Sequence, residues 1–211
     1  MKKFSFILCA AVALLSGICL MAQTPEQVVE KMTTELSRGE AEGLSMVLEI
    51  NLPIIGKVRT QNHQRGSRLR TEMENSNGKT TTWIDGNTMW IYQPSKNEIT
   101  IDKVDISKSA SGSMDEMDRF SGITDGYDLS FEKQTEKAWY ILCTKNKSNK
   151  TKDAPKTMNL EVAKGSYMPL SLRMKVNGLS IAIENVSVGV PEAAVVFKAS
   201  DYPGAKITDK R

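Results

Sequence analysis

The sequence predicts a mainly β protein in which about ten short antiparallel strands are interrupted by only two helices. Three observations support this. Apolar and polar residues alternate along many segments, the dipeptides Asp85-Gly86 and Asn177-Gly178 mark tight hairpin turns, and helical spacing of apolar residues is confined to two stretches. Such an order gives a strongly curved sheet, an open barrel or a sandwich. The helices are then expected to cover one face of the sheet.

The N-terminal stretch has the pattern of an export signal. Lys2 and Lys3 precede the apolar run 4–21, which is too short and too one-sided for a good membrane span. Ala22 is the best position for cleavage, so we expect a signal peptide over 1–22 and a single folded domain over 23–211. Cys19 lacks the preceding Leu-Ala-Gly type of sequence that marks a lipidated cysteine.

Charge and cysteine content exclude several classes of protein. Loss of Lys2 and Lys3 with the signal lowers the formal net charge from +3 to +1, which is not the balance of a nucleic-acid-binding protein. Cys143 is then the one cysteine left, so no internal disulfide is expected in an oxidising compartment. Stability must come from the burial of apolar surface.

A helix is predicted over 25–37. Thr24 is suited to cap it, Pro25 suits the first helical position, and Gln27 can complete a capping box. Its apolar residues fall at four-residue spacing: Val28, Met32 and Leu36. A second, short helix is predicted over 114–120, where three-residue spacing relates Met114, Met117 and Phe120.

Period-two alternation predicts the strands. It is clearest over 44–52, which Pro53 ends, and over 170–176. The other predicted strands are 57–64, 67–74, the two arms of the hairpin 82–93, 98–102, 127–131, 139–144, 157–163, 179–184 and 195–198. The lysine-rich connection 145–156 is polar; it could meet an anionic membrane, but lysines that keep a loop soluble are the simpler interpretation.

No motif for catalysis, metal or nucleotide binding is found. His63 is the single histidine, which rules out a histidine pair for zinc, and it lies in a polar stretch that favours a solvated strand residue. Cys143 lies within a strand pattern typical of a packed thiol. Neither GxxxxGK[ST] nor GxGxxG occurs. We therefore expect no catalytic residue, no metal and no cofactor, and a hydrolase is the least favoured hypothesis.

The hairpin 82–93 concentrates aromatic residues although the chain contains only 6% of them. Its second arm carries Trp90 and Tyr92 on one face and Met89 and Ile91 on the other, so both faces require cover. A sandwich core would explain this. The many methionines favour a different interpretation, because flexible thioether side chains repack around varied apolar guests. A sheet and two helical lids that share them could hold a flexible hydrocarbon.

Two stretches of the sequence resemble a known family. "IDGNTMWIYQP" (84–94) and "FKASDYPGAKITDKR" (197–211) resemble segments of the outer-membrane lipoprotein carriers, the LolA family. The resemblance implies an open half β-barrel covered by an N-terminal helix and a short central helix. It also implies an apolar groove that binds the acyl chains of lipoproteins and ferries them across the periplasm. Arg65 best matches the family's lid-latch arginine, although Leu69 and Thr71 stand where phenylalanine and tryptophan are usual.

The leading hypothesis is thus a monomeric periplasmic chaperone for lipoprotein transport and outer-membrane biogenesis. Its partners would be acylated lipoproteins or other lipids, an inner-membrane lipoprotein exporter and an outer-membrane acceptor, without nucleic acid. The predicted groove residues are Met46, Leu48, Trp90, Tyr92, Leu172 and Met174, and the predicted lid residues are Val28, Met32, Leu36, Met114, Met117 and Phe120. An alternative with the same fold is a lipid-sensing regulatory module that docks on a membrane signalling partner.

Overall fold

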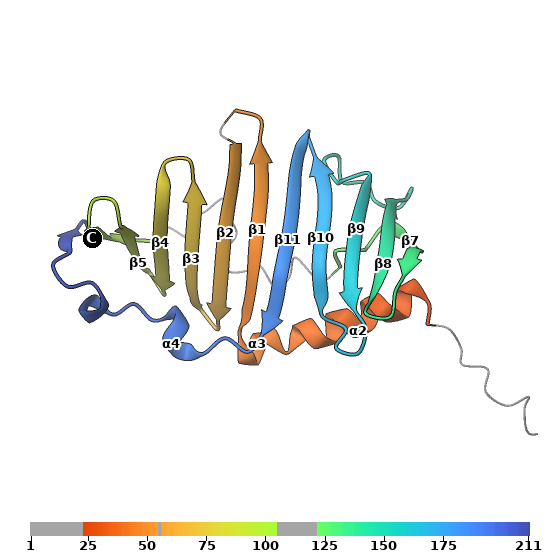
Figure 1. The fold of residues 1–211 in the computed structure, drawn as a ribbon, viewed down its shortest axis with the longest axis horizontal. Coiled ribbons are helices and arrows are strands. Elements are labelled where there is room, and N and C mark those ends of the chain that lie inside the picture. The colour runs from red at the N-terminus through yellow and green to blue at the C-terminus, as the bar shows by residue number, and fades with distance from the viewer. Residues whose placement is uncertain (1–22, 55, 105–121) are drawn as a thin grey trace, which may run out of the picture.

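The protein is described by a computed structural model that covers residues 23–54, 56–104 and 122–211. Its centre is one 12-stranded sheet with the order β12-β6-β5-β4-β3-β2-β1-β11-β10-β9-β8-β7 (Figure 1). The two outermost strands, β12 and β7, are not paired with each other, so the curved sheet stays open. This confirms the predicted class, a mainly β open half-barrel. The predicted signal peptide and the helix 114–120 lie outside the described residues.

Helices precede the first strand and lie between the last two strands of the chain. They are α2 (Pro25–Ser37), α3 (Gly39–Glu42), α4 (Glu192–Val195) and the 3-10 turn η1 (Ala199–Asp201). The strands are β1 (Leu44–Leu52), β2 (Gly56–Arg65), β3 (Arg68–Asn75), β4 (Gly78–Asp85), β5 (Thr88–Gln93), β6 (Glu98–Lys103), β7 (Tyr127–Gln134), β8 (Ala138–Lys145), β9 (Thr157–Ala163), β10 (Pro169–Val176), β11 (Leu179–Val188) and β12 (Lys206–Asp209). Neighbouring strands pair antiparallel except β12, which lies parallel to β6.

Three local predictions differ from the structure. The strand predicted over 195–198 is wrong: the chain forms α4 up to Val195 and then continues without strand pairing. Short apolar runs cannot separate a helix from a strand by periodicity, which explains the error. Strand β12 was not predicted, because its parallel partner β6 lies far away in the sequence. The first hairpin turn is one residue later than expected, since Asp85 pairs with Thr88.

The N-terminal helix α2 forms as predicted, with its local signals satisfied. The amide of Gln27 donates to Thr24 Oγ1 at 3.3 Å, and the amide of Thr24 donates to Gln27 Oε1 at 3.0 Å. This reciprocal pair is a capping box, and Pro25 occupies the first turn. The chain then bends at Arg38 into α3, where the guanidinium pairs with the Glu42 carboxylate. The cap at Thr24 and the bend at Arg38 mark the two ends of α2, which packs on the sheet between them.

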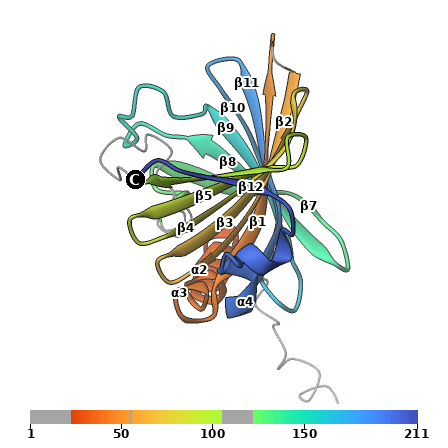
Figure 2. The same ribbon diagram turned by 90° about the vertical axis from the view of Figure 1, so that its left-hand side faces the viewer.

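Strand register assigns each residue to one of two faces, because directly paired residues point the same way. Leu44 pairs with Gln64, which pairs with Leu69. We call this the helix-side face, since Leu44 packs against α2. Alternate residues form the opposite face, on which Arg70 of β3 pairs with Trp83. We call this the aromatic face. Figure 2 shows α4 and α2 on opposite sides of the sheet.

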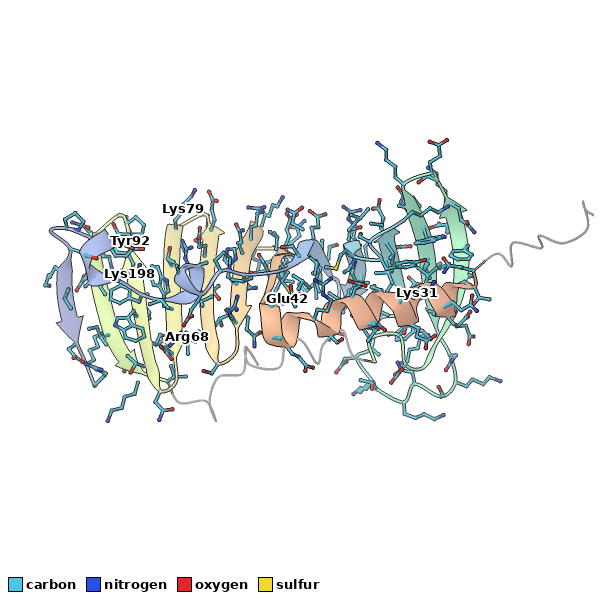
Figure 3. The ribbon with its side chains drawn as sticks, turned by 90° about the horizontal axis from the view of Figure 1, so that it is seen from below. Lys31, Glu42, Arg68, Lys79, Tyr92 and Lys198 are labelled. Carbon is cyan, nitrogen blue, oxygen red and sulfur yellow. The ribbon has the colours of Figure 1, made fainter. Side chains whose placement is uncertain are left out.

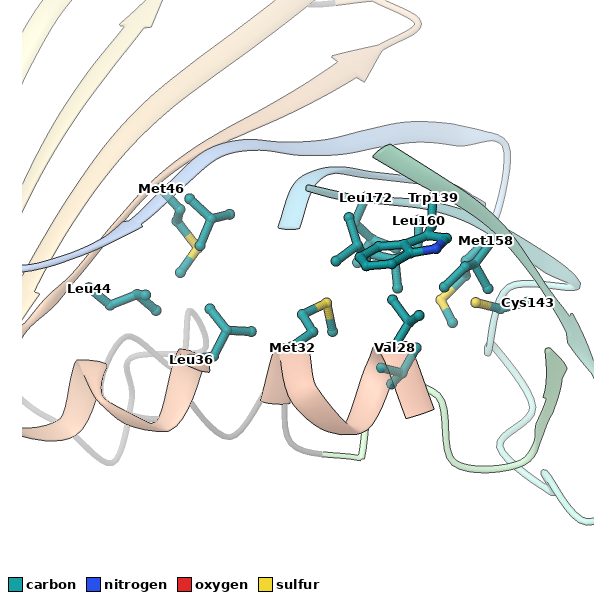
Figure 4. Packing of buried hydrophobic residues seen from close by; sticks show 14 residues of the cluster. Val28, Met32, Leu36, Leu44, Met46, Trp139, Cys143, Met158, Leu160 and Leu172 are labelled. Atoms are coloured by element: carbon teal, nitrogen blue, oxygen red, sulfur yellow. The ribbon is translucent and has the colours of Figure 1, made fainter. Parts of the chain in front are cut away.

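The helix-side face forms the main core with α2. Val28, Met32 and Leu36 of the helix are each at most 5% exposed. Figure 4 shows them pointing at the sheet side chains. The sheet residues of this cluster are Leu44, Met46, Trp139, Ile141, Cys143, Met158, Leu160, Val162, Leu172 and Val186. Aliphatic and sulfur-containing side chains thus dominate the contact beneath the helix.

The aromatic face is covered by the chain that follows β11. We call residues 189–205 the C-terminal strap. Its Phe197 lies 5.4 Å from the ring of Trp83, and its Tyr202 lies 5.6 Å from the same ring. Seen from below in Figure 3, Lys198 of the strap lies near Tyr92, whereas Lys31 lies on α2 at the other half of the molecule. The aromatic hairpin therefore contacts the protein's own C-terminal segment.

Candidate functional site

The structure distributes the six predicted groove residues over three environments. Met46 and Leu172 belong to the packed core under α2, with 5% and 2% of their surface exposed. Leu48 and Met174 lie on the same face but are only half-buried. These four residues share the helix-side face, as the groove hypothesis requires.

Trp90 and Tyr92 do not join that face. Trp90 pairs with Trp83 across the hairpin and stacks on Phe197 at 5.3 Å, with 17° between the ring planes. Tyr92 lies 4.4 Å from the ring of Tyr202. The structure thus separates the two aromatic residues from the other four by the thickness of the sheet. The aromatic residues of the segment 197–202 were a signal for this contact that the sequence argument did not use.

An apolar surface continues along the helix-side face beyond the core. Leu48 pairs with Ile183, and Ile183 pairs with Leu172. One step further from the core, Ile50 and Met174 both pair with Ile181. The residues of this surface keep part of their area exposed: Leu48, Ile50, Val58, Met174, Ile181 and Ile183. We call these six residues the apolar row.

A cavity of about 640 Å³ opens where the apolar row meets the core. Its apolar side is formed by Met174 of the row, the buried Met158, Ile123, Tyr127 and Pro155, and its other side is polar, with Asp125, Ser148, Asn149, Lys150 and Thr151. This volume lies within the range of protein sites for small ligands. Methionine side chains can adjust their rotamers to a guest of variable shape. The cavity and the row together are the best candidate for a ligand site among the described residues.

The helix α2 lies over one end of this candidate site. Val28, Met32 and Leu36, the predicted lid residues of this helix, form its sheet-facing side. The other three predicted lid residues, Met114, Met117 and Phe120, lie outside the described part of the chain. Whether α2 moves as a lid stays a prediction.

The first half of α2 is held by a polar and aromatic contact. Tyr167, in the turn between β9 and β10, stacks on Trp139 at 5.2 Å. Its hydroxyl oxygen accepts a hydrogen bond from Lys31 Nζ at 3.2 Å and lies 3.0 Å from Gln23 Nε2. These hydrogen bonds lower the pKa of Tyr167, that from Gln23 most and that from Lys31 next. Lys31 therefore anchors the helix to the sheet at one exposed site.

Arg65, the predicted lid latch, links backbone segments. Its guanidinium donates to the carbonyl oxygen of Val190 at 2.6 Å and to that of Glu42 at 3.2 Å. Glu42 ends α3, and Val190 begins the strap. Arg65 thus ties the helical segment and the strap to the end of β2. Its role as a latch for α2 stays a prediction.

Cys143 and His63, the two residues considered for catalysis, lie in different environments. Cys143 is fully buried in the core, and burial raises the pKa of its thiol to about 11, so the reactive thiolate is disfavoured. His63 lies on the aromatic face beside Arg70, and burial, then the charge of Arg70, lowers its pKa. Within the described ranges, no group of His, Cys, Asp and Glu side chains is suited to hold a metal ion. No helix in these ranges is long and apolar enough to cross a membrane.

The fold is similar to that of several solved bacterial proteins, among them the lipoprotein LppX. LprF from Mycobacterium bovis covers 80% of this chain and 96% of its own, at 8% identity and a TM-score of 0.56. LppX from Mycobacterium tuberculosis covers 78% and 96%, at 10% identity and a TM-score of 0.50. A LolA superfamily protein from Nitrosomonas europaea, the family that the sequence resembles, covers 85% and 100%, at 11% identity and a TM-score of 0.36.

Identities this low indicate a common fold and no more. Compared by sequence, the chain matches no protein-family model and no curated protein. Any conclusion about the ligand must therefore come from the chain's own side chains.

Proposed function

We propose that this protein binds lipid acyl chains on its helix-side face and carries acylated lipoproteins between the membranes of a bacterial envelope. The observation that supports this most directly is the apolar row, which runs from the core under α2 into the cavity beside Met158 and Met174. An apolar surface that is left half-exposed next to a cavity is typical of a binding site. The predicted export signal is consistent with work in the periplasm.

The energy available from such a site is large. A chain of ~15 methylenes gains roughly 12 kcal/mol when it leaves water, at about 0.8 kcal/mol per CH₂. Part of that gain is offset if α2 must move to admit the chain, because Met32 and Leu36 then lose contacts with the sheet. The net affinity for an acyl chain therefore depends on how stably α2 packs on the sheet when no chain is bound.

The sequence holds no nucleotide-binding motif, so we propose that transfer runs by relative affinity. The protein, acting as a monomer, would take the acylated lipoprotein from an inner-membrane exporter. It would release this cargo to an outer-membrane acceptor that binds the cargo more tightly than the carrier does. No energy source within this chain is then required.

The direct test is the lipid content of the native protein. Protein purified from the periplasm should release acyl lipids on solvent extraction, identified by mass spectrometry. The same protein should bind an environment-sensitive fatty-acid dye that an acylated lipoprotein displaces. If the purified protein contains no acyl lipid and does not bind the dye, the proposal is contradicted.

Variants can place the site on the helix-side face. Met174→Asp puts a carboxylate into the cavity, and we expect the dye affinity to fall by at least tenfold because burial of an unpaired charge is costly. The matched control is Leu170→Asp in the same strand, where the native side chain is already 44% exposed. Equal losses in both variants would contradict this location.

A further inference from the structure

The turn after β1 presents an apolar side chain to solvent. Ile54 is 98% exposed and follows Leu52 and Pro53 at the end of the longest hairpin in Figure 1. Exposure of single apolar residues is ordinary, but nearly complete exposure at a protruding loop is not required by the fold. We call residues 52–54 the apolar tip.

Several exposed lysines lie at the same end of the sheet as the apolar tip. Thr144 pairs with Thr157, so the connection 145–156 leaves and returns at this end. The exposed lysines on β2, on β10 and in this connection include Lys57, Lys147, Lys150, Lys152, Lys156 and Lys175. In the described part of the chain, Lys57 is paired with Glu49 at 2.7 Å, whereas no ion pair neutralises the other five. The end of the sheet that carries the tip therefore also carries lysines whose charge no ion pair of the described residues neutralises.

Two cavities open at this end. A polar cavity of about 820 Å³ is lined by Lys152, Lys156, Arg173 and Lys175, against the carboxylates of Glu49 and Asp153. Its cations outnumber its acids, which suits an anionic group. The cavity next to Met174 on the helix-side face is lined in part by Lys150 and Thr151 of the same connection. The candidate acyl site thus opens beside the lysines.

We propose that this end of the molecule docks on the surface of an anionic lipid bilayer, with the apolar tip inserted among the head groups and the lysines on their phosphates. An apolar side chain flanked by lysines is the combination that binds a charged membrane interface. The exposed apolar area of the tip is too small to form a stable protein interface alone. Docking in this orientation brings the cavity beside Met174 to the bilayer, although binding to vesicles does not depend on the acyl site.

Co-sedimentation with vesicles tests the proposal. The processed protein should bind vesicles of phosphatidylcholine with about 30% phosphatidylglycerol, bind pure phosphatidylcholine far less, and be released at high salt. Ile54→Ser should weaken binding about tenfold, because the buried apolar side chain is lost. The matched control is Leu170→Ser, another exposed apolar residue at the opposite end of the sheet, which should change nothing.

The lysines are tested in the same assay. The double variant Lys150→Ala with Lys152→Ala should weaken binding by about tenfold or more, since each lysine near an anionic surface contributes about fivefold. The control pair is Lys137→Ala with Lys210→Ala, two exposed lysines at the other end of the sheet. Equal losses in the two pairs would show diffuse attraction by net charge and overturn the proposed orientation.

The fluorescence of a dye attached at position 54 tests whether the apolar tip inserts into the bilayer. A polarity-sensitive dye on Ile54→Cys should shift to the blue on anionic vesicles, and the same dye on Leu170→Cys should not. The native Cys143 is fully buried, so it does not compete for the label. No shift at position 54, or vesicle binding that Ile54→Ser leaves intact, overturns the proposal and leaves a protein partner as the occupant of the tip. The vesicle assay contains no fatty-acid dye and no lipoprotein, so a protein that binds anionic vesicles but not the dye would support docking and contradict only acyl binding.

Discussion

The two faces of the sheet are covered in physically different ways. On the helix-side face, α2 packs aliphatic and thioether side chains such as Met32 against Leu160 and Met158. On the aromatic face, the C-terminal strap places Phe197 and Tyr202 against two tryptophans and Tyr92. Both covers come from the ends of the described chain, and both bury a large apolar area.

The difference lies in how each cover is fastened. The strap is held by Arg65 at one end, by an ion pair of Arg68 with Glu192, and by the pairing of β12 with β6 at the other. Aromatic rings at fixed angles leave little room to repack. The helix bends at Arg38 into α3, whose Glu42 carbonyl Arg65 holds, and Lys31 binds Tyr167 near its start. Between these points it packs on side chains that can change rotamer. This contrast agrees with a closed structural face and, under the proposed function, an adjustable binding face.

The largest effect should come from removing a tryptophan under each cover. Trp83→Ala and Trp139→Ala should each lower the free energy of unfolding by about 3 to 5 kcal/mol, because each deletes a buried ring. Hydrogen exchange should then separate them: Trp83→Ala exposes amides of the strap, and Trp139→Ala exposes amides of α2. Exchange that spreads equally to both covers in either variant would contradict two independent covers. The milder Trp83→Phe and Trp139→Phe serve if the alanine variants do not fold.

A pH titration should report on the helix-side core through Cys143. Burial raises the pKa of this thiol from 9.0 to about 11, so the folded state excludes the thiolate. As the pH rises from about 9 to 11, the unfolded chain ionises first and the free energy of unfolding falls, by on the order of 2 kcal/mol. Cys143→Ala should remove this part of the pH dependence, measured by urea unfolding of both proteins. Identical slopes for the two proteins would contradict a closed core around the thiol.

Arg65→Ala should act on the strap more than on α2. The guanidinium loses two charged hydrogen bonds to backbone carbonyls, at a cost of about 1.5 kcal/mol for this partly exposed side chain. We expect faster hydrogen exchange near Val190 and unchanged affinity for the fatty-acid dye. A changed dye affinity with an intact strap would instead support the latch role that the resemblance implies. Arg59→Ala, an exposed arginine of the same strand, is the control.

The smallest effect should come from the helix cap. Thr24→Ala removes the acceptor for the Gln27 amide and should lower the free energy of unfolding by about 1 kcal/mol. Because the loss is local, exchange in the first turns of α2 should rise while the strap stays protected. If α2 is the lid, the dye should also enter this variant faster, which stopped-flow fluorescence can measure. Thr144→Ala, at an exposed threonine of β8, is the control.

Sequence reasoning placed most strands correctly because alternation is a local property. Leu44–Leu52 and Pro169–Val176 show it clearly, and the capping residues around Thr24 fixed the start of α2. The same reasoning grouped Trp90 with Met46 and Leu172 in one groove. Alternation indicates that two neighbouring residues point to opposite faces, but it does not say which face of one strand continues into which face of another. Only the register from β1 through β5 decides that.

The sequence by itself determined a curved antiparallel sheet, an amphipathic N-terminal helix and a chain that provides no catalytic or metal-binding motif. The tertiary structure decided that the strap covers the aromatic hairpin, that the apolar row remains beside the cavity at Met174, and that the lysine-rich connection lies at the same end of the sheet as the apolar tip. These contacts join residues far apart in the chain. They depend on how the sheet is ordered and curved, which no local pattern of residues encodes.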